Sequence, residues 1–297
     1  MSDAAPIEPG RAAASHVRRV GVVGAGTMGL GIAQVFAQAG FDVLLHDTSA
    51  PALDRARQDI EKSLAKFVEK GKLAAADRDA TLRRLTLADA LEALAAVDLA
   101  VEAIVESIDA KRALFAALDR LTPPSTLLAS NTSSISITVL GAATSRADRL
   151  FGLHFMNPVP LMPLVELVRG QATSDGTMAA GLALTRALGK TGIEAADYPG
   201  FIANRILMPM INEAVFALME GVGTAEAIDG VMKLGMNHPM GPLTLADFIG
   251  LDVCVAILDV LHQGFGDPKY RACPLLRRLV AAGHLGRKSG KGFYSYA

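Results

Sequence analysis

"VGVVGAGTMGLGIAQVFAQAGFDVLLHD", residues 20–47, begins with a β-branched run that ends in glycine. Its middle part has apolar residues at helical spacing before Gly40, and "FDVLLHD" is a second apolar run. These patterns predict a buried strand, a helix and another buried strand. Parallel strands need such a crossover connection, so this stretch predicts a βαβ unit.

The turn inside this unit has the glycine pattern of a dinucleotide-binding loop, Gly24-x-Gly26-x-x-Gly29. We expect Gly24 to allow a tight turn, Gly26 to let the backbone approach a pyrophosphate, and Gly29 to let helix and sheet pack closely. The helix N-terminus adds free N–H groups for the anion. Asp47 ends the second strand about 18 residues after Gly29, where a carboxylate accepts the ribose hydroxyls of NAD and disfavours NADP. The loop therefore predicts NAD as cofactor.

Further strands and helices alternate beyond this unit. Residues 51–84 predict an inserted pair of helices, broken near Gly71, and short apolar runs alternate with helical stretches from there to "LVELVRG". Repeated alternation of this kind predicts an α/β fold with a doubly wound, Rossmann-type sheet.

The pattern changes near Pro199. From Phe201 onward, residues 201–221, 224–235, 244–266 and 274–283 all read as helical, with Gly or Pro between them. We therefore expect an NAD-binding domain at 17–198 and an all-helical domain at 199–297, preceded by a disordered lead-in at 1–16. So much apolar helix in a small domain favours a homodimer through this domain over a self-contained bundle.

Length, net charge, hydrophobic content and cysteine count narrow the class of protein to which the chain can belong. The chain has 297 residues and a formal charge of −1, which favours no nucleic-acid partner. Hydrophobic residues make up 51%, yet charges break every long apolar run, so no membrane span is expected. Two cysteines, Cys254 and Cys273, give neither a disulfide framework nor metal-ligand spacing. We therefore expect no metal. The Ala/Pro-rich N-terminus lacks the apolar centre that is typical of a signal peptide, so we expect a cytoplasmic protein.

A candidate acid/base pair lies in "GLHFMNPVPLMPLVE", residues 152–166. Removing a hydride from an alcohol also requires a group that takes the hydroxyl proton, and histidine titrates near neutrality. His154 ends a predicted strand, and a Pro-rich turn brings Glu166 back beside its ring. The carboxylate would fix the imidazole tautomer and stabilise the imidazolium. A buried histidine satisfied by backbone groups is the alternative.

The chain resembles the short-chain L-3-hydroxyacyl-CoA dehydrogenases, whose bacterial members include 3-hydroxybutyryl-CoA dehydrogenases. The resemblance runs from Val20 to Tyr296 and rests on seven ordered motifs: "GAGTMGLGIA", "VEAIVE", "SNTSS", "GLHFMNPVPLMPLVE", "PGFIANR", "GMNHPMGPLTLADFIGLD" and "GRKSGKGFYSY". It implies NAD-dependent, reversible oxidation of an L-3-hydroxyacyl-CoA to a 3-ketoacyl-CoA, with fatty-acid metabolism as one setting.

The resemblance also implies roles for particular residues. His154 and Glu166 would form the catalytic dyad, with Ser133 and Asn204 near the reacting oxygens of the substrate. The implied cofactor contacts are Gly24, Gly26, Thr27, Met28, Gly29, Asp47, Glu106, Lys111, Ser133, Asn157 and Lys288. The implied coenzyme A contacts on the inserted helices are Ser63, Lys66 and Lys70. A helix cap for Ser133, a helix-surface amide for Asn204 and a solvated lysine face remain the simpler readings of those residues.

Two other functions fit part of the sequence. A sugar-acid dehydrogenase of the lambda-crystallin type would share the cofactor domain, and a non-catalytic NAD-binding protein would need only the glycines and Asp47. The presence of His154, Glu166, Ser133 and Asn204 together favours the enzyme. Acyl chain length, physiological direction and partner enzymes are not encoded in any motif.

Overall fold

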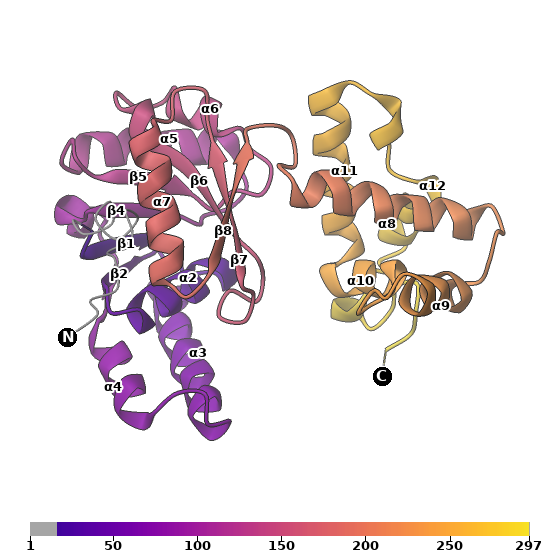
Figure 1. Cartoon of the computed structure of the whole chain (residues 1–297), viewed down its shortest axis with the longest axis horizontal. Coiled ribbons are helices and arrows are strands. Elements are labelled where there is room, and N and C mark those ends of the chain that lie inside the picture. Colours follow the sequence, from indigo (N-terminus) through magenta and orange to yellow (C-terminus); the bar gives the residue numbers. More distant parts are fainter. Residues whose placement is uncertain (1–16, 297) are drawn as a thin grey trace, which may run out of the picture. The chain divides into compact units, whose positions relative to one another are not determined.

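The computed structural model describes residues 17–296, and the chain divides into two compact units with the boundary between Asp197 and Tyr198 (Figure 1). The lead-in expected at residues 1–16 lies outside the described residues. Each unit has its own buried core. The two units are therefore described one at a time.

The first unit is built on an eight-stranded sheet with the order β3-β2-β1-β4-β5-β6-β7-β8. Neighbouring strands are parallel from β3 to β6, β7 runs antiparallel to β6, and β8 is parallel to β7. The strands are β1 (Arg19–Val23), β2 (Asp42–His46), β3 (Leu85–Ala88), β4 (Leu99–Glu102), β5 (Leu127–Ser130), β6 (Leu150–Phe155), β7 (Leu164–Arg169) and β8 (Thr191–Ala196). The predicted doubly wound, Rossmann-type fold is confirmed.

Helices connect these strands and cover the sheet. They are α2 (Thr27–Gln38), α5 (Ile108–Leu121), α6 (Ile137–Gly141) and α7 (Asp175–Ala187), with short 3₁₀ helices η1 (Leu91–Ala96) and η2 (Ala147–Arg149). Most positions of the parallel strands are apolar and buried, as is typical of strands covered on both faces, and polar residues such as Arg19, Asp42 and Glu102 lie at strand ends. Val22, Phe36, Leu45 and Phe151 are fully buried in this core.

Two strands that the sequence analysis did not identify close the two ends of the sheet. β3 has only four residues, and β8 carries Gly192 and has an exposed outer pattern. Short, partly polar edge strands show little periodicity of apolar residues in the sequence. They also make the edge of the sheet less able to pair with strands of other chains. The helix α7 between β7 and β8 was missed as well.

The inserted pair consists of α3 (Ala50–Glu69) and α4 (Ala75–Arg83), which extend together below the sheet (Figure 1). Ser49 caps α3 by accepting a hydrogen bond from the N–H of Ala52. The buried residues of α3 are Leu53, Ala56, Ile60 and Leu64, which recur at helical spacing. Gly71, with φ +65°, makes the turn between the helices.

The second unit is helical. Its helices are α8 (Ala203–Met219), α9 (Ala225–Gly235), α10 (Pro242–Ile249), α11 (Leu251–Phe265) and α12 (Pro274–Ala281), with η3 (Pro268–Tyr270) and η4 (Arg287–Ser289). The stretch 244–266, expected as one helix, is two: Gly250 has φ +108°, which no helix contains, and ends α10. Met208, Leu243, Cys254 and Leu258 are among its core residues. Among the described helices none is both long and apolar enough to span a membrane.

Candidate active site

The glycine-rich turn joins β1 to α2, and each of its glycines lacks a side chain for a different physical reason. Gly24 has φ +106°, and a Cβ there would lie 2.4 Å from the carbonyl oxygen of Ala103. A Cβ on Gly29 would lie 1.7 Å from the carbonyl oxygen of Gly24. Gly29 thus makes room mainly for the turn itself, rather than for helix–sheet packing as expected. A Cβ on Gly26 would meet nothing within 4 Å, so that side of the turn is open.

The open side of the turn suits a dinucleotide. Gly26 is the N-cap of α2 without a side-chain capping bond, so the first N–H groups of the helix, from Thr27 onward, remain available to an anion. Thr27 is exposed there, whereas the Met28 side chain packs against the core and leaves only its backbone for such a contact. Gly24, Gly26, Thr27 and Asp47 line a cleft of about 930 Å³. These residues fit NAD.

The Asp47 carboxylate binds backbone N–H groups of the protein and also lines the cleft. Its Oδ2 accepts a hydrogen bond of 2.8 Å from the N–H of Ala25, and its Oδ1 accepts one of 2.9 Å from the N–H of Ser49. Each carboxylate oxygen has a second lone-pair direction left for a ribose hydroxyl. Asp47 therefore both holds the turn and faces the cleft.

Strand pairing brings His154 and Glu166 together. They are directly opposed residues of the antiparallel pair β6–β7, so their side chains lie on the same face of the sheet. His154 Nδ1 and Glu166 Oε2 are 2.8 Å apart, and both side chains are buried. A buried carboxylate on Nδ1 orients the ring and favours the tautomer whose Nε2 can accept a proton.

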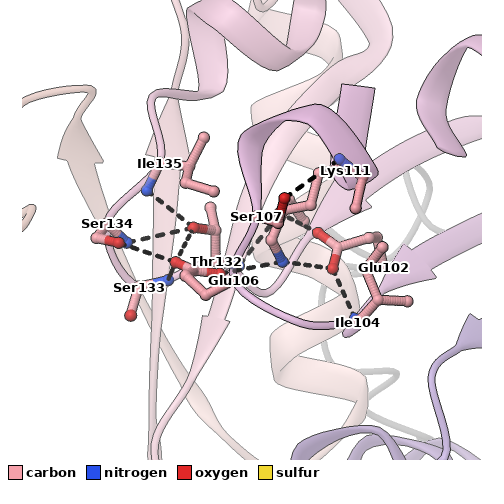
Figure 2. A network of polar contacts seen from close by, with 11 residues as sticks. Glu102, Ile104, Glu106, Ser107, Lys111, Thr132, Ser133, Ser134 and Ile135 are labelled. Atoms are coloured by element: carbon pink, nitrogen blue, oxygen red, sulfur yellow. Dashed lines mark hydrogen bonds and ion pairs between the residues drawn. The ribbon is translucent and has the colours of Figure 1, made fainter. Parts of the chain in front are cut away.

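A polar network joins three neighbouring segments at the carboxyl ends of β4 and β5 (Figure 2). Lys111 Nζ lies 2.5 Å from Glu102 Oε1 and 3.1 Å from Glu106 Oε2. Burial raises the pKa of Glu106, but the charge of Lys111 and hydrogen bonds from Thr132 and Ser134 lower it more, to below its ordinary value. Lys111, expected as a cofactor contact, is 1% exposed and committed to this network.

Ser133 lies in the segment between β5 and α6, and Glu106 holds this segment. Glu106 Oε1 accepts from the Thr132 hydroxyl at 2.5 Å, the Ser133 N–H at 3.2 Å and the Ser134 hydroxyl at 2.9 Å. The N-cap of α6 is Ser136, so Ser133 does not cap this helix. Asn131 Oδ1 accepts from the N–H of Phe155 at 2.9 Å, which ties the segment to the residue after His154.

A smaller cavity, of about 280 Å³, brings the expected coenzyme A contacts together. Ser63 and Lys66 of α3 line it, together with its C-cap residue Lys70 and Asn157 from the loop after β6. Lys72 and Gln34 also line it, although the sequence analysis named neither. Three lysines around one cavity suit an anionic ligand group.

The remaining two expected residues belong to the second unit. Asn204 lies in the first turn of α8 and is buried, not a helix-surface amide. Lys288 Nζ pairs with Asp252 Oδ1 at 2.6 Å. Burial raises the pKa of Asp252, but the Lys288 ammonium and backbone hydrogen bonds together lower it more, to below its ordinary value.

Sequence reasoning missed several residues that the structure brings to the site. Glu102 is the first carboxylate of "VEAIVE" and Asn131 is part of "SNTSS", so both lay inside quoted motifs. Their place in these motifs marked Glu102 and Asn131 as candidates, but only the fold shows which group each side chain binds. Lys72 follows Gly71 and is far from Asn157 in the sequence, so the sequence did not indicate that the two residues line the same cavity.

Comparison with protein families gives two matches that together cover most of the chain. The model of the 3-hydroxyacyl-CoA dehydrogenase NAD-binding domain matches residues 19–198. The model of the 3-hydroxyacyl-CoA dehydrogenase C-terminal domain matches residues 200–296.

Individual relatives agree with the family models. The chain is 58% identical to a probable 3-hydroxybutyryl-CoA dehydrogenase of Deinococcus radiodurans, over 94% of this chain and 100% of the relative. It is 52% identical to a probable 3-hydroxybutyryl-CoA dehydrogenase of Bacillus subtilis, over 95% and 98%. The crystal structure of (S)-3-hydroxybutyryl-CoA dehydrogenase from Ralstonia eutropha is similar with a TM-score of 0.92 and 50% identity, over 95% of this chain and 99% of that one.

Proposed function

The chain belongs to the 3-hydroxyacyl-CoA dehydrogenase family and oxidises 3-hydroxyacyl-CoA with NAD, and we propose that His154 and Glu166 supply the acid/base chemistry. The single observation that carries this proposal is the 2.8 Å contact between His154 Nδ1 and Glu166 Oε2 inside the sheet. With Nδ1 donating to this carboxylate, Nε2 is the ring nitrogen that exchanges a proton with the substrate in the proposed mechanism.

In the oxidative direction His154 Nε2 takes the proton of the C3 hydroxyl, while Glu166 stabilises the charge that forms on the ring. When bound, NAD accepts the hydride that leaves C3. In the reductive direction the protonated ring returns its proton to the oxygen. Ser133 and Asn204 donate hydrogen bonds to the reacting oxygens, and the backbone at Ser133 is held by Glu106.

The cofactor contacts follow from the glycine-rich turn. The N–H groups at the start of α2 bind the pyrophosphate, and Asp47 accepts the ribose hydroxyls. Glu106, Ser133, Asn157 and Lys288 are the other proposed cofactor contacts. Lys111 acts there through Glu106, because its own ammonium is enclosed by carboxylates.

The coenzyme A part of the substrate lies along α3, with its phosphates near Ser63, Lys66 and Lys70. This binding energy, far from the reacting carbon, holds C3 in place for transfer. The acyl group is short, as in 3-hydroxybutyryl-CoA; the similarity to 3-hydroxybutyryl-CoA dehydrogenases supports this choice.

We place the NAD-binding domain at 17–198 and a helical domain that contributes to substrate binding and to a homodimer at 199–297; the boundary between the two compact units lies one residue earlier, between Asp197 and Tyr198. An apolar hollow of about 470 Å³ on the second unit supports the dimer: Val222 and Val231 line it, with 76% and 61% of their surfaces exposed. We place the protein in the cytoplasm, a reducing compartment in which the buried thiols of Cys254 and Cys273 would stay reduced.

The test of this function is NADH oxidation by the purified protein with acetoacetyl-CoA and with longer 3-ketoacyl-CoAs. We expect turnover with all of them and the highest kcat/KM for acetoacetyl-CoA. A protein that turns over only medium-chain or long-chain substrates would contradict the chain-length proposal. A protein that ignores every 3-ketoacyl-CoA would contradict the proposed chemistry.

A further inference from the structure

We propose that Glu102 is a positioning residue for the reaction: it fixes Lys111, Lys111 fixes Glu106, and Glu106 fixes the backbone of the Ser133 segment. The proposal rests on the proposed role of Ser133 at the substrate, and it adds a residue that touches neither substrate nor cofactor. Figure 2 shows the chain of contacts from β4 through α5 to the segment after β5.

Glu102 is a fully buried member of the network. It is 0% exposed, and it ends β4 between the neighbouring strands β1 and β5. Its Oε1 accepts from Lys111 Nζ at 2.5 Å and from the N–H of Ile104 at 2.7 Å, and its Oε2 accepts from the Ser130 hydroxyl at 2.6 Å. A buried carboxylate without partners would be very costly, so these three contacts fix one orientation.

The second link is Lys111. Its ammonium is buried between Glu102 and Glu106, so it cannot move to solvent without leaving Glu102 unpaired. The Glu106 carboxylate is 39% exposed and could otherwise rotate freely. Lys111 holds its Oε2 and thereby aims its Oε1 at the segment that carries Ser133.

The third link is the segment itself. Three of its groups converge on Glu106 Oε1, including the Ser133 N–H, and the N–H groups of Ser134 and Ile135 donate to the Thr132 hydroxyl oxygen. The Thr132 N–H donates to the Ser130 oxygen at 3.1 Å, which is again bonded to Glu102. Both ends of the segment are therefore tied, directly or through Lys111, to one buried carboxylate.

The test compares Glu102→Gln with Asp98→Asn. Asp98 precedes the same strand at its opposite end, where its Oδ2 accepts from the N–H groups of Arg18 and Arg19 at 2.8 Å. Both variants remove a carboxylate that holds β4 to a neighbour, so both lower the melting temperature. Only Glu102→Gln should lower kcat for acetoacetyl-CoA at saturating NADH, by about 10- to 100-fold, because small misplacements at the reacting atoms are that costly.

Hydrogen exchange gives a readout that needs no substrate. We expect amides 132–135 to exchange about tenfold faster in Glu102→Gln than in Asp98→Asn, because their bonds depend on the network. If both variants had the same kcat and the same exchange in this segment, Glu102 would be structural only. If Glu102→Gln does not fold, the apolar replacement Glu102→Met with Lys111→Met removes both buried charges together. Wild-type kcat and exchange in that double variant would overturn the proposal.

The pH profile tests the link through Lys111. Among the described residues Lys111 is the cation that pairs with Glu106, and Glu102 is the other carboxylate of the network. Glu106 must be ionised to accept its three bonds, so activity is lost as pH falls through its lowered pKa. In Lys111→Met that pKa rises, and the acidic limb of kcat should move to higher pH. An unchanged acidic limb would contradict this link.

Discussion

Gly26 and Gly29 show how two glycines of one motif can serve different purposes. Gly26 has ordinary dihedral angles, φ −72° and ψ −175°, and space around its missing Cβ. Gly29 has no space, because the Gly24 carbonyl oxygen lies where its Cβ would be. The missing side chain of Gly26 leaves space for a ligand, and that of Gly29 leaves space for the turn itself.

Two alanine substitutions separate these purposes. Gly26→Ala should keep the melting temperature close to that of the wild type but weaken NADH binding by about tenfold or more, because the new methyl group points to the pyrophosphate position. Gly29→Ala should unfold at a markedly lower temperature, with a loss of about 2–4 kcal/mol from the clash. Thermal unfolding and NADH fluorescence titration measure both. Equal melting temperatures for the two variants would contradict the assignment.

At the scale of elements, the active site depends on where strands end and which helix follows. The antiparallel turn from β6 to β7 creates the His154–Glu166 contact, and Lys190, just before β8, stabilises that turn by donating to the carbonyl oxygens of Val159 and Met162, both at 2.7 Å. Burial lowers the pKa of Lys190. The helix α3 is inserted after β2 of the sheet, and the proposed role of its lysine face is to bind coenzyme A.

The lysines of α3 can be tested against a neighbour. Lys66→Ala and Lys70→Ala should each raise KM for acetoacetyl-CoA by about tenfold, since a charged hydrogen bond contributes roughly 1.5–3 kcal/mol, while kcat at saturation changes little. Lys62→Ala is the matched control: Lys62 pairs with Asp59 on the same helix and does not line the cavity. High salt should reduce the difference between the variants and the wild type. A KM increase in the control alone would refute the assignment.

How far the sequence predicts this structure also depends on the elements. Long periodic stretches such as α3 and α11 and the βαβ unit at the start were predictable, because burial imposes a clear period on them. The short edge strands β3 and β8 have no such period, and the break at Gly250 is set by a backbone angle. In the site, the glycine turn and the proximity of His154 to Glu166 were predictable. The burial of Lys111 depended on two carboxylates meeting it in space.

At the scale of the whole molecule, the second unit exposes apolar surface that a monomer would leave in water. Besides Val222 and Val231, Leu234 and Met236 of the same region are exposed by 89% and 60%. Such a surface is typical of a protein–protein contact. A symmetric partner would cover it.

We expect a mass of about twice 31.0 kDa by light scattering and a shift to the monomer in Val231→Glu, because a carboxylate in an apolar contact stays unpaired. The control is Ile193→Glu, which places the same charge on a half-exposed position of β8 in the first unit. A monomeric wild type at micromolar concentration, or an unchanged mass in Val231→Glu, would contradict the proposed contact.

In the proposed mechanism the His154–Glu166 pair performs the proton transfer. The most direct measurement is single-turnover NADH oxidation with acetoacetyl-CoA by the wild type, His154→Gln and Glu166→Gln, with NADH affinity measured separately. We predict that both variants bind NADH as the wild type does and lose turnover by about 10²–10⁴-fold, the usual contribution of a positioned acid or base. Turnover within a few-fold of the wild type in His154→Gln, with NADH binding intact, would show that another group moves the proton.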